Sequence, residues 1–356
     1  MRHSLLLLLG GLIISGVLCA ESTPSKALLV LSKGDKTLAI VDPSTLKVVA
    51  RMPSGPDPHE VIASADGRFA YVSNYGGGAY DTLTIVDLLQ QKTLSAVDLG
   101  PLRGPHGLAF VDGKVWFTAE AAKAIGSYDP AAKNVDWILG TGQNRTHMIC
   151  VSEDLKRIIT SNVGSGTMTL IDKTMSTGNG PGPGPGGPRP GAAKGPGSDR
   201  PIAPPRSDWD ETVVPVGRGA EGFDVSPDGR ELWAANAQDG TISILDVGEK
   251  KVVQTLDANV KSANRLKFTP DGKLVLVSSL GGSDVAFFDA AERRERKRVK
   301  VGHGAAGILM HPDGSRAYVA CTPDDYVVII DLKSLAVTDH INAGKQPDGL
   351  AWAVQR

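Results

Sequence analysis

Residues 222–246 read GFDVSPDGRELWAANAQDGTISILD, and they contain one complete copy of a pattern that recurs along the chain. It holds a short apolar segment, an Asp228-Gly229 turn, a second segment ending in Ala-Asn, a loop, and a third segment ending in Asp246. Glycine accepts the positive φ that a tight hairpin requires, so Asp-Gly predicts a turn between antiparallel strands. VVQTLD follows and predicts a fourth strand. The stretch is therefore expected to form one small four-stranded sheet.

The third strand of this unit recurs along the chain. Each copy is a short apolar segment that ends in aspartate: TLAIVD (37–42), TLTIVD (82–87), AIGSYD (124–129), TMTLID (167–172), TISILD (241–246), DVAFFD (284–289) and YVVIID (326–331). Successive copies lie 42 to 45 residues apart, except for one step of 74 residues. A period of about 43 residues with several short strands per unit is typical of β-propeller blades.

The two ends of the chain complement each other. The first repeat begins without an innermost strand, whereas GLAWAV (349–354) is an innermost strand with nothing after it. A seventh blade built from both ends would remove exposed sheet edges. We therefore predict an all-β fold, a seven-bladed β-propeller of four-stranded antiparallel blades over residues 27–356, with the last blade closed by both termini.

Two resemblances follow from the motifs. SADGRFAYVSN, SPDGRELWAAN and HPDGSRAYVAC, each followed by an Asp-terminated strand, resemble the YVTN-type β-propeller repeat family. GPHGLAFVDGKVWFTAE (104–120) is similar to a blade of the streptogramin B lyase family, although Ala119 separates Thr118 from Glu120. The first resemblance implies the fold, and propellers host many activities. The second implies metal-assisted elimination and draws attention to His106.

Several segments bear on location and partners. Residues 1–20 combine a charged start with the apolar run Leu5 to Leu9, which predicts a signal peptide and a periplasmic or secreted protein without a membrane span. With its net charge of −1, the chain lacks the excess of positive charge that is typical of nucleic-acid-binding proteins, so no nucleic-acid partner is expected. Cys150 and Cys321 lie in apolar strand patterns and are expected to be buried thiols rather than a disulfide.

Two stretches depart from the repeat. The long step contains a Gly/Pro-rich insert, residues 173–212, whose composition predicts disorder. Propeller topology places this insert on the face opposite the ring of first-strand residues. ERRERKRVK (292–300) lies on that same face and is interpreted as a solvated hairpin, with an anionic partner as the alternative.

Counting back from each turn aligns the residue that opens the first strand of every repeat. First strands are innermost in a propeller, so these side chains should meet around one mouth of the central channel: His59, His106, His147, Glu221, Asn264, Ala306 and Asp348. Glu60 and Arg265 are adjacent in sequence, and His303 lies in the loop before the sixth first strand. The ring is either a defined site or the polar lining of a wet channel.

These residues support two hypotheses of different class. The first is a monomeric binding or recognition protein for a small molecule or a protein partner, with Glu60, Asn264, Arg265, His303 and Asp348 as ligand contacts. The second is a metal-assisted lyase or lactonase with His106, His147 and Glu221 as catalytic residues. Imidazole and carboxylate are common ligands of divalent metals, so His59, His106, His147 and Glu221 are the predicted ligands of such a cofactor. A histidine free of metal would act as general base.

Overall fold

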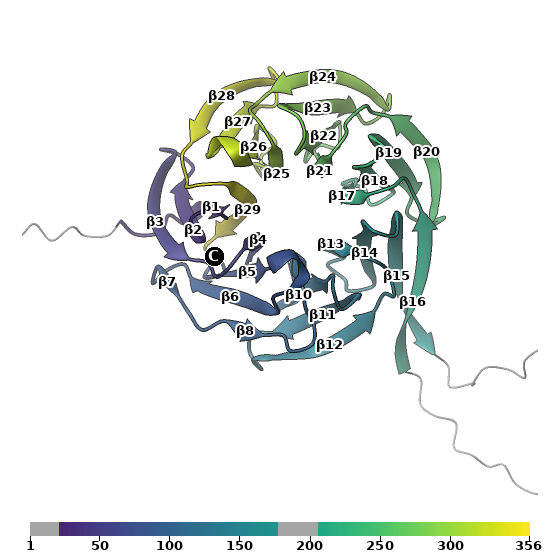
Figure 1. Ribbon diagram of the computed structural model, residues 1–356, viewed down its shortest axis with the longest axis horizontal. Helices are drawn as coiled ribbons and strands as arrows, with labels where there is room; N and C mark the ends of the chain where they lie inside the picture. Colours follow the sequence, from purple (N-terminus) through teal and green to yellow (C-terminus); the bar gives the residue numbers. More distant parts are fainter. Residues whose placement is uncertain (1–20, 177–205) are drawn as a thin grey trace, which may run out of the picture.

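Seven antiparallel sheets surround a central axis in the computed structural model, which describes residues 21–176 and 206–356 (Figure 1). Each sheet runs from an inner strand at the axis to an outer strand at the rim. We number the blades in chain order from the one that contains His59, so the blade built from both termini is the seventh. The predicted seven-bladed, four-stranded propeller is confirmed.

The strands of the blades, from inside to outside, have the following bounds. Blade 1 holds β4 (Pro58–Ala63), β5 (Phe69–Asn74), β6 (Thr82–Asp87) and two short outer pieces, β7 (Lys92–Thr93) and β8 (Val97–Asp98). Blade 2 holds β9 (Pro105–Val111), β10 (Lys114–Ala119), β11 (Ala124–Asp129) and β12 (Asn134–Gly140). Blade 3 holds β13 (Thr146–Val151), β14 (Arg157–Asn162), β15 (Thr167–Ser176) and β16 (Arg206–Pro215).

The remaining blades follow the same order. Blade 4 holds β17 (Ala220–Val225), β18 (Glu231–Asn236), β19 (Thr241–Asp246) and β20 (Lys251–Asp257). Blade 5 holds β21 (Ala263–Phe268), β22 (Leu274–Ser279), β23 (Asp284–Asp289) and β24 (Arg294–Lys300), and blade 6 holds β25 (Ala305–Met310), β26 (Arg316–Cys321), β27 (Tyr326–Asp331) and β28 (Ala336–Ile341). Blade 7 holds β29 (Pro347–Val354), β1 (Lys26–Ser32), β2 (Thr37–Asp42) and β3 (Lys47–Pro53). Two 3-10 helices, η1 (Gly76–Gly78) and η2 (Thr322–Asp324), lie in loops.

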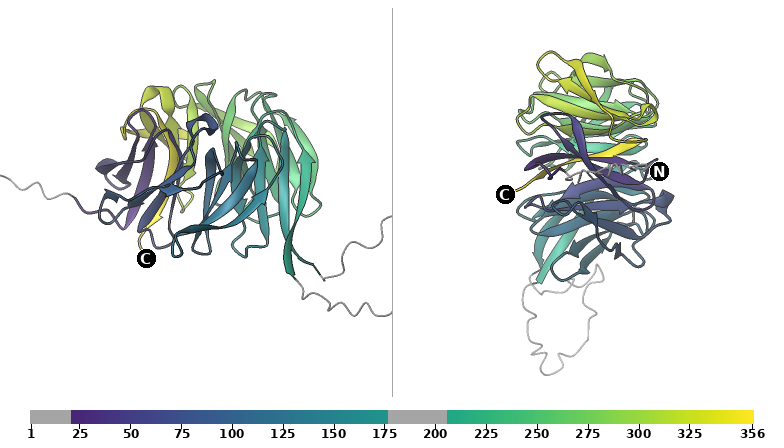
Figure 2. Two further views of the ribbon diagram at one scale, coloured as in Figure 1. Left: turned by 60° about the horizontal axis from the view of Figure 1, so that its bottom comes forward. Right: turned by 90° about the vertical axis from the view of Figure 1, so that its left-hand side faces the viewer.

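Blade 7 closes the ring as predicted. β29 pairs antiparallel with β1, with Ala353 opposite Ala27 and Leu350 opposite Val30. The last strand of the chain therefore becomes the innermost strand of a blade whose other three strands come from the start of the described chain. Figure 2 shows the resulting disc from the side. Closure leaves no blade without neighbours on both sides, which protects the sheet edges.

The repeated residues form the core and the turns. Trp233 and Tyr318 occupy equivalent positions of the second strand and are at most 1% exposed. The glycine of the Asp-Gly turn has a positive φ throughout, for example +74° at Gly229. In blade 3, Leu155 takes its place and adopts the same left-handed conformation, with φ +54°. Cys321 is buried and Cys150 half-buried, and both are free thiols, which agrees with the expectation of no disulfide.

The predicted limits of the insert in blade 3 need correction. β15 and β16 continue beyond the disc as a paired ribbon, with Lys173 opposite Trp209 and Met175 opposite Ser207. Residues 173–176 and 206–212 are therefore strands, and Figure 2 shows the ribbon leaving one face of the disc. The sequence pattern missed this because Ser, Asp and Thr dominate the extension. The rest of the predicted insert, residues 177–205, lies outside the described residues, as does the predicted signal peptide.

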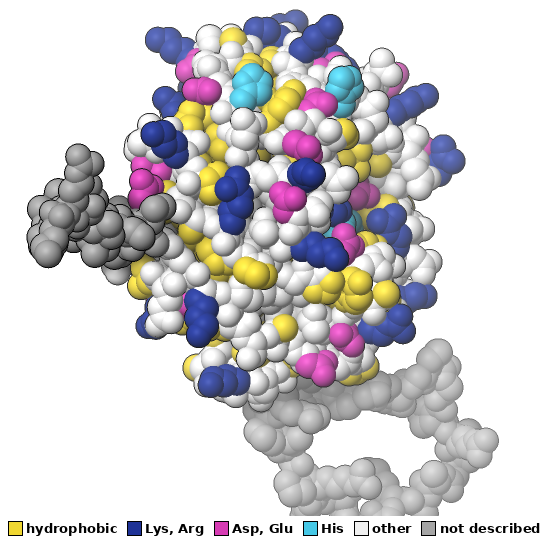
Figure 3. Space-filling model, turned by 60° about the vertical axis from the view of Figure 1, so that its left-hand side comes forward, with side chains coloured by type: hydrophobic (Ala, Val, Ile, Leu, Met, Phe, Trp, Pro, Cys, Tyr) yellow, Lys and Arg dark blue, Asp and Glu magenta, His cyan; other side chains and the backbone are white. Residues whose placement is uncertain are grey.

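The outer surface carries mixed charge. Figure 3 shows lysine and arginine side chains interspersed with aspartate and glutamate on the flank of the disc. The basic run of 292–300 forms the outer hairpin of blade 5, where Arg298 pairs with Glu295 at 2.8 Å and Arg293 pairs with Glu231 at 2.5 Å. In residues 21–176 and 206–356, no helix is long and apolar enough to cross a membrane.

Candidate functional site at the channel mouth

A bulge in the innermost strand delivers side chains to the channel in every blade. The ring residue is always the second residue of that strand, and the strand register shifts beside it, as between Pro58 and Val61 in β4. A bulge sets two residues opposite one on the partner strand and re-aims their side chains. Two consecutive residues of β4, His59 and Glu60, both reach partners in the channel: His59 contacts His106, and Glu60 contacts Arg265.

Hydroxyl groups hold these bulges in place. Ser73 accepts a hydrogen bond from the Glu60 amide at 3.1 Å and donates one to the His106 carbonyl of the next blade at 2.9 Å. Thr118 connects Gly107 to the His147 carbonyl in the same way, at 2.9 and 2.7 Å. Ser161 and Ser278 repeat this bridge in blades 3 and 5. The hydroxyls fix the backbone of each ring residue relative to its neighbour, so the side chains above are preorganised.

The residue after the ring position is glycine where neighbouring blades come closest. A Cβ added at Gly307 would lie 2.2 Å from the Asp348 carbonyl oxygen, and one at Gly222 would lie 2.3 Å from the Asn264 carbonyl oxygen. Both glycines have ordinary φ values, so the requirement is space rather than backbone conformation. Because these glycines have no side chain, the innermost strands of neighbouring blades can lie close together, and the ring of innermost strands is narrower.

Three histidines and a glutamate form a continuous arc across blades 1 to 4. The His59 and His106 ring centroids are 5.0 Å apart, and those of His106 and His147 are 3.8 Å apart. His147 Nε2 then pairs with Glu221 Oε1 at 2.8 Å. The three residues predicted as catalytic, His106, His147 and Glu221, are therefore consecutive contacts.

His147 lies between two carboxylates. Its Nδ1 donates to Glu120, and Nε2 faces Glu221. Burial alone would lower the pKa of His147, but the charge of Glu221 and the hydrogen bond to Glu120 outweigh it and raise the pKa to about 9. The same ion pair offsets the burial of Glu221 and lowers the pKa of this carboxyl to about 2. His147 is thus an imidazolium at neutral pH.

Tyr75 and Arg145 complete the surroundings of Glu120. The Tyr75 hydroxyl donates to Glu120 Oε2 at 2.5 Å, and Arg145 Nε is 3.6 Å from the same oxygen. The Tyr75 ring contacts His59 and His106 edge-on, with centroid distances of 4.8 and 5.1 Å. Tyr75 precedes the glycine turn η1, so a loop residue covers the histidine arc from above the mouth.

His106 is the electrostatic opposite of His147. It is 3% exposed, and burial lowers its pKa well below 6.5, an effect that the positive charge of His147 reinforces. The ring is therefore neutral at physiological pH. Its Nδ1 is buried and has no hydrogen-bond partner among the described residues. Buried polar atoms in folded proteins nearly always have a hydrogen-bond partner, so we expect a bound group to hydrogen-bond to this nitrogen.

A second charged group surrounds His59. Lys33 Nζ lies 2.9 Å from His59 Nε2 and pairs with Asp348 Oδ2 at 3.3 Å. Asp57 lies 3.4 Å from His59 Nε2 and accepts the Gly76 amide at 2.8 Å. The hydrogen bond to His59 is the main reason that the pKa of Asp57 falls to about 2. This group brings Asp348 to the ring as predicted and ties η1 to blade 1.

An ion pair crosses the channel. Arg265 of blade 5 contacts Glu60 of blade 1, and both side chains are largely buried. These two blades are not neighbours, so the ion pair spans the ring and places two charged groups across the channel. Asn264 is buried in the ring with its Oδ1 unpartnered among the described residues, and Ala306 contributes no polar group.

One predicted ligand contact lies elsewhere. The His303 side chain is 78% exposed and pairs with Asp324 at 3.1 Å, away from the ring contacts. The loop before β25 turns this side chain outward, which a sequence position alone does not reveal. Conversely, Lys33, Asp57, Tyr75 and Arg145 belong to the mouth although the alignment of first strands did not select them. Lys33 and Tyr75 directly follow the second strand of their blades, and Asp57 and Arg145 directly precede a first strand, so the repeat places these positions in register but does not set their residue types.

The predicted metal quartet does not converge on one point. In the described ranges no group of three or more His, Cys, Asp or Glu side chains is arranged to hold a metal ion. His147 uses both ring nitrogens on carboxylates, and coordination needs an unprotonated nitrogen. Divalent-metal binding by His59, His106, His147 and Glu221 stays a prediction, and it would require His147 to leave at least one of its partners.

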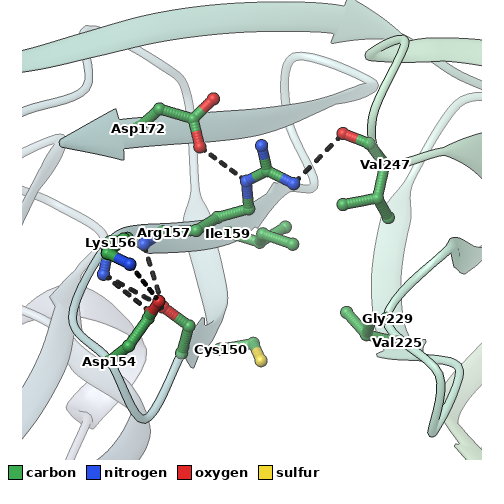
Figure 4. Close-up of a pocket in the computed structure, with 10 residues that line it drawn as sticks. Cys150, Asp154, Lys156, Arg157, Ile159, Asp172, Val225, Gly229 and Val247 are labelled. Atoms are coloured by element: carbon green, nitrogen blue, oxygen red, sulfur yellow. Dashed lines mark hydrogen bonds and ion pairs between the residues drawn. The ribbon is translucent and has the colours of Figure 1, made fainter. Parts of the chain in front are cut away.

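A different hollow lies far from these residues, between blades 3 and 4. It measures about 390 Å³ and is lined by Cys150, Ile159 and Val225 below a charged rim (Figure 4). Arg157 at this rim donates to Asp172 at 2.5 Å and to the Val247 carbonyl at 3.2 Å. The charged residues at the rim of this hollow pair with one another, and the hollow shares no lining residue with the channel mouth.

Comparison with known proteins identifies the fold alone. No protein-family description matches the chain, and no curated protein matches it. Among solved structures, a putative 6-phosphogluconolactonase from Bacteroides fragilis is 16% identical, with a TM-score of 0.69 over 93% of this chain and 99% of that one. A putative 6-phosphogluconolactonase from Bacteroides uniformis is 15% identical, with a TM-score of 0.67 over 92% and 99%. Hydrazine synthase from Kuenenia stuttgartiensis is 17% identical, with a TM-score of 0.62 over 83% and 89%.

Proposed function

We propose that this protein is an exported binding protein that holds a small polar ligand at the channel mouth. The observation that carries the proposal is His106, a buried imidazole that is neutral at physiological pH and whose Nδ1 lacks a partner in the described chain. A buried nitrogen without a hydrogen-bond partner, surrounded by charged groups from several blades, is typical of a site that binds a hydrogen-bonding ligand. The predicted signal peptide is the basis for export.

The surroundings of His106 support a polar ligand rather than an apolar one. Lys33, Arg145 and His147 supply positive charge, and Glu120 and Glu221 supply negative charge within the same arc. The Lys33, His147 and Glu221 charges have close partners within the mouth, so a polar ligand would exchange with these pairs. The Tyr75 ring contacts the His106 ring edge-on, so a ligand that binds His106 would lie close to Tyr75.

A second candidate function is hydrolysis or elimination at the same place. The neutral imidazole of His106 can accept a proton at pH 7, and the adjacent His147 imidazolium can stabilise an anionic intermediate. For a lactone, His106 would take a proton from water as the water oxygen attacks the carbonyl carbon, and the carbonyl electron pair would move to its oxygen beside the His147 imidazolium. Collapse of this tetrahedral intermediate would break the ring C–O bond, and His106 would return the proton to the released alkoxide, which leaves a hydroxy acid. Two neighbours in fold carry the name putative 6-phosphogluconolactonase, which favours testing lactones first. A bound divalent metal would polarise the carbonyl.

A ligand panel tests the binding proposal. The protein would be melted with sugars, sugar acids, amino acids and lactones, alongside H106A and the control H340A, whose histidine lies exposed on β28. We expect at least one molecule to raise the Tm of wild type and H340A but not of H106A. A panel in which every stabilising molecule acts equally on H106A would contradict the proposal. Proton release from the lactones, followed at constant pH, tests the second candidate.

A further inference from the structure

A hollow of about 580 Å³ adjoins the mouth over blades 3, 4 and 5. Glu221 and Arg145 line it, and both also contact the histidine arc or its partner Glu120. The hollow is therefore continuous with the proposed site. Its volume lies in the range of about 300–1,000 Å³ that small-molecule pockets usually have. Gln238, Lys261 and Ser262 form the rest of its polar lining.

Lys261 is the uncompensated charge of this hollow. Its side chain is exposed and forms no ion pair with any residue in 21–176 or 206–356, whereas Glu221 opposite is matched by His147 at 2.8 Å. The hollow thus contains one carboxylate whose charge is already neutralised and one ammonium group whose charge is not. An anion entering it gains attraction without meeting an unpaired carboxylate.

Arg145 also retains free hydrogen-bond donors. Its side chain is 51% exposed, and the carboxylate nearest to it is Glu120, at 3.6 Å. Glu120 also accepts the Tyr75 hydroxyl and binds His147, so Arg145 shares this carboxylate with two other groups and keeps donors that a ligand could use. A guanidinium presents a planar set of donors that suits the paired oxygens of a carboxylate or phosphate.

We propose that this hollow binds the acidic group, carboxylate or phosphate, of a small hydroxylated molecule, with Arg145 and Lys261 on the acidic oxygens. Gln238 and Ser262 line the hollow with an amide and a hydroxyl, which pair with the hydroxyl groups of such a molecule. The inference rests on the proposed function, because it assigns the ligand class of the same mouth. The acidic end lies over blades 3 to 5, and the rest of the molecule extends toward His106.

Calorimetric titration with D-gluconate, D-glucose 6-phosphate and D-glucose at low salt tests the assignment. At least one of the two anions should bind wild type about ten-fold more tightly than glucose, and whichever binds better identifies carboxylate or phosphate. K261M should weaken the binding of that anion by about five-fold or more. The matched control is K345M, which removes an exposed lysine that has no ion pair among the described residues and lies in the loop before β29, away from the hollow, and it should change affinity by less than about two-fold.

Two results would overturn the inference. One is anion binding no stronger than that of glucose, and the other is anion binding that K261M leaves unchanged. Failure of the proposed function is distinguishable. If a neutral molecule of the panel stabilises wild type but not H106A while both anions fail to bind, only the ligand class is wrong. If nothing in the panel depends on His106, the site itself is wrong.

Discussion

Raising the pH from 6 to 9.5 should remove a defined part of the protein's stability through His147. Its pKa in the folded protein is about 9, against 6.5 in a model peptide, because Glu221 and Glu120 outweigh burial. A group whose folded pKa is raised contributes stability that is complete below its unfolded pKa and disappears as the pH passes the folded pKa. The loss should therefore occur between about pH 6.5 and pH 9.

The size of the loss follows from the same displacement. Each unit by which the pKa of His147 in the folded protein exceeds its value in the unfolded chain corresponds to about 1.4 kcal/mol. The difference therefore gives about 3 kcal/mol of unfolding free energy. The low pKa of Glu221 reflects the same ion pair and is not added. His147 is 3% exposed, so solvent screening does not reduce the value greatly.

Urea unfolding followed by tryptophan fluorescence at pH 6, 7.5 and 9.5 measures this loss. Wild type and the control H340Q should lose about 3 kcal/mol more than H147Q over this range. Tyrosine, lysine and cysteine also titrate near pH 9, but they are common to all three proteins and cancel in the comparison. Equal losses in the three proteins would refute the assignment of His147 as an imidazolium between two carboxylates.

Three further predictions concern packing, the insert and metal. G307A should destabilise the protein by about 2 kcal/mol or more, because its Cβ would meet the Asp348 carbonyl, whereas G140A, with no atom near its Cβ, should be close to neutral in the same denaturation experiment. Replacing residues 177–205 with a short Gly-Ser link should change the Tm by less than about 5 °C, as their composition predicts, and a larger fall would show that they pack. If the predicted quartet binds a divalent ion, elemental analysis should find the metal in wild type and lose it in H59A, H106A, H147A and E221A; equal metal content in all five would remove the quartet as the binding site.

The repeat made the fold and the ring predictable because both depend on strand register. Each inner strand buries alternate residues against the next blade, so the apolar pattern sets the blade and the turn sets the position of His106 or Glu221. The closing pair of β29 and β1 follows from the same count. The limits of the insert were not predictable, because the ribbon of β15 and β16 is exposed and carries no apolar periodicity.

The partners within the mouth depend on distances that a sequence does not contain. Arg265 meets Glu60 across the channel, and this contact depends on the width of the ring, which no repeat pattern states. The pairing of His147 with Glu120 depends on the loop after β10, and the cover of His106 by Tyr75 depends on the turn η1. The loop after β10 is four residues long, as are its counterparts in blades 3 to 7, so its length gives no signal, and only the loop of blade 1, residues 75–81, is longer. Residue types at the ring were therefore predictable, and their protonation states were not.

Nitrogen-15 NMR of the imidazole rings tests whether a neutral His106 lies beside a protonated His147, since it reports the protonation state of each histidine as the pH changes. Spectra of protein labelled at histidine, assigned with H106A and H147Q, would be recorded from pH 5.5 to pH 9.5. We expect His106 to be neutral at pH 6.5, where an ordinary imidazole is half protonated, while His147 keeps protons on both nitrogens to above pH 8. Two rings that both titrate near pH 6.5 would contradict it, because the mouth would then be an ordinary solvated channel lining.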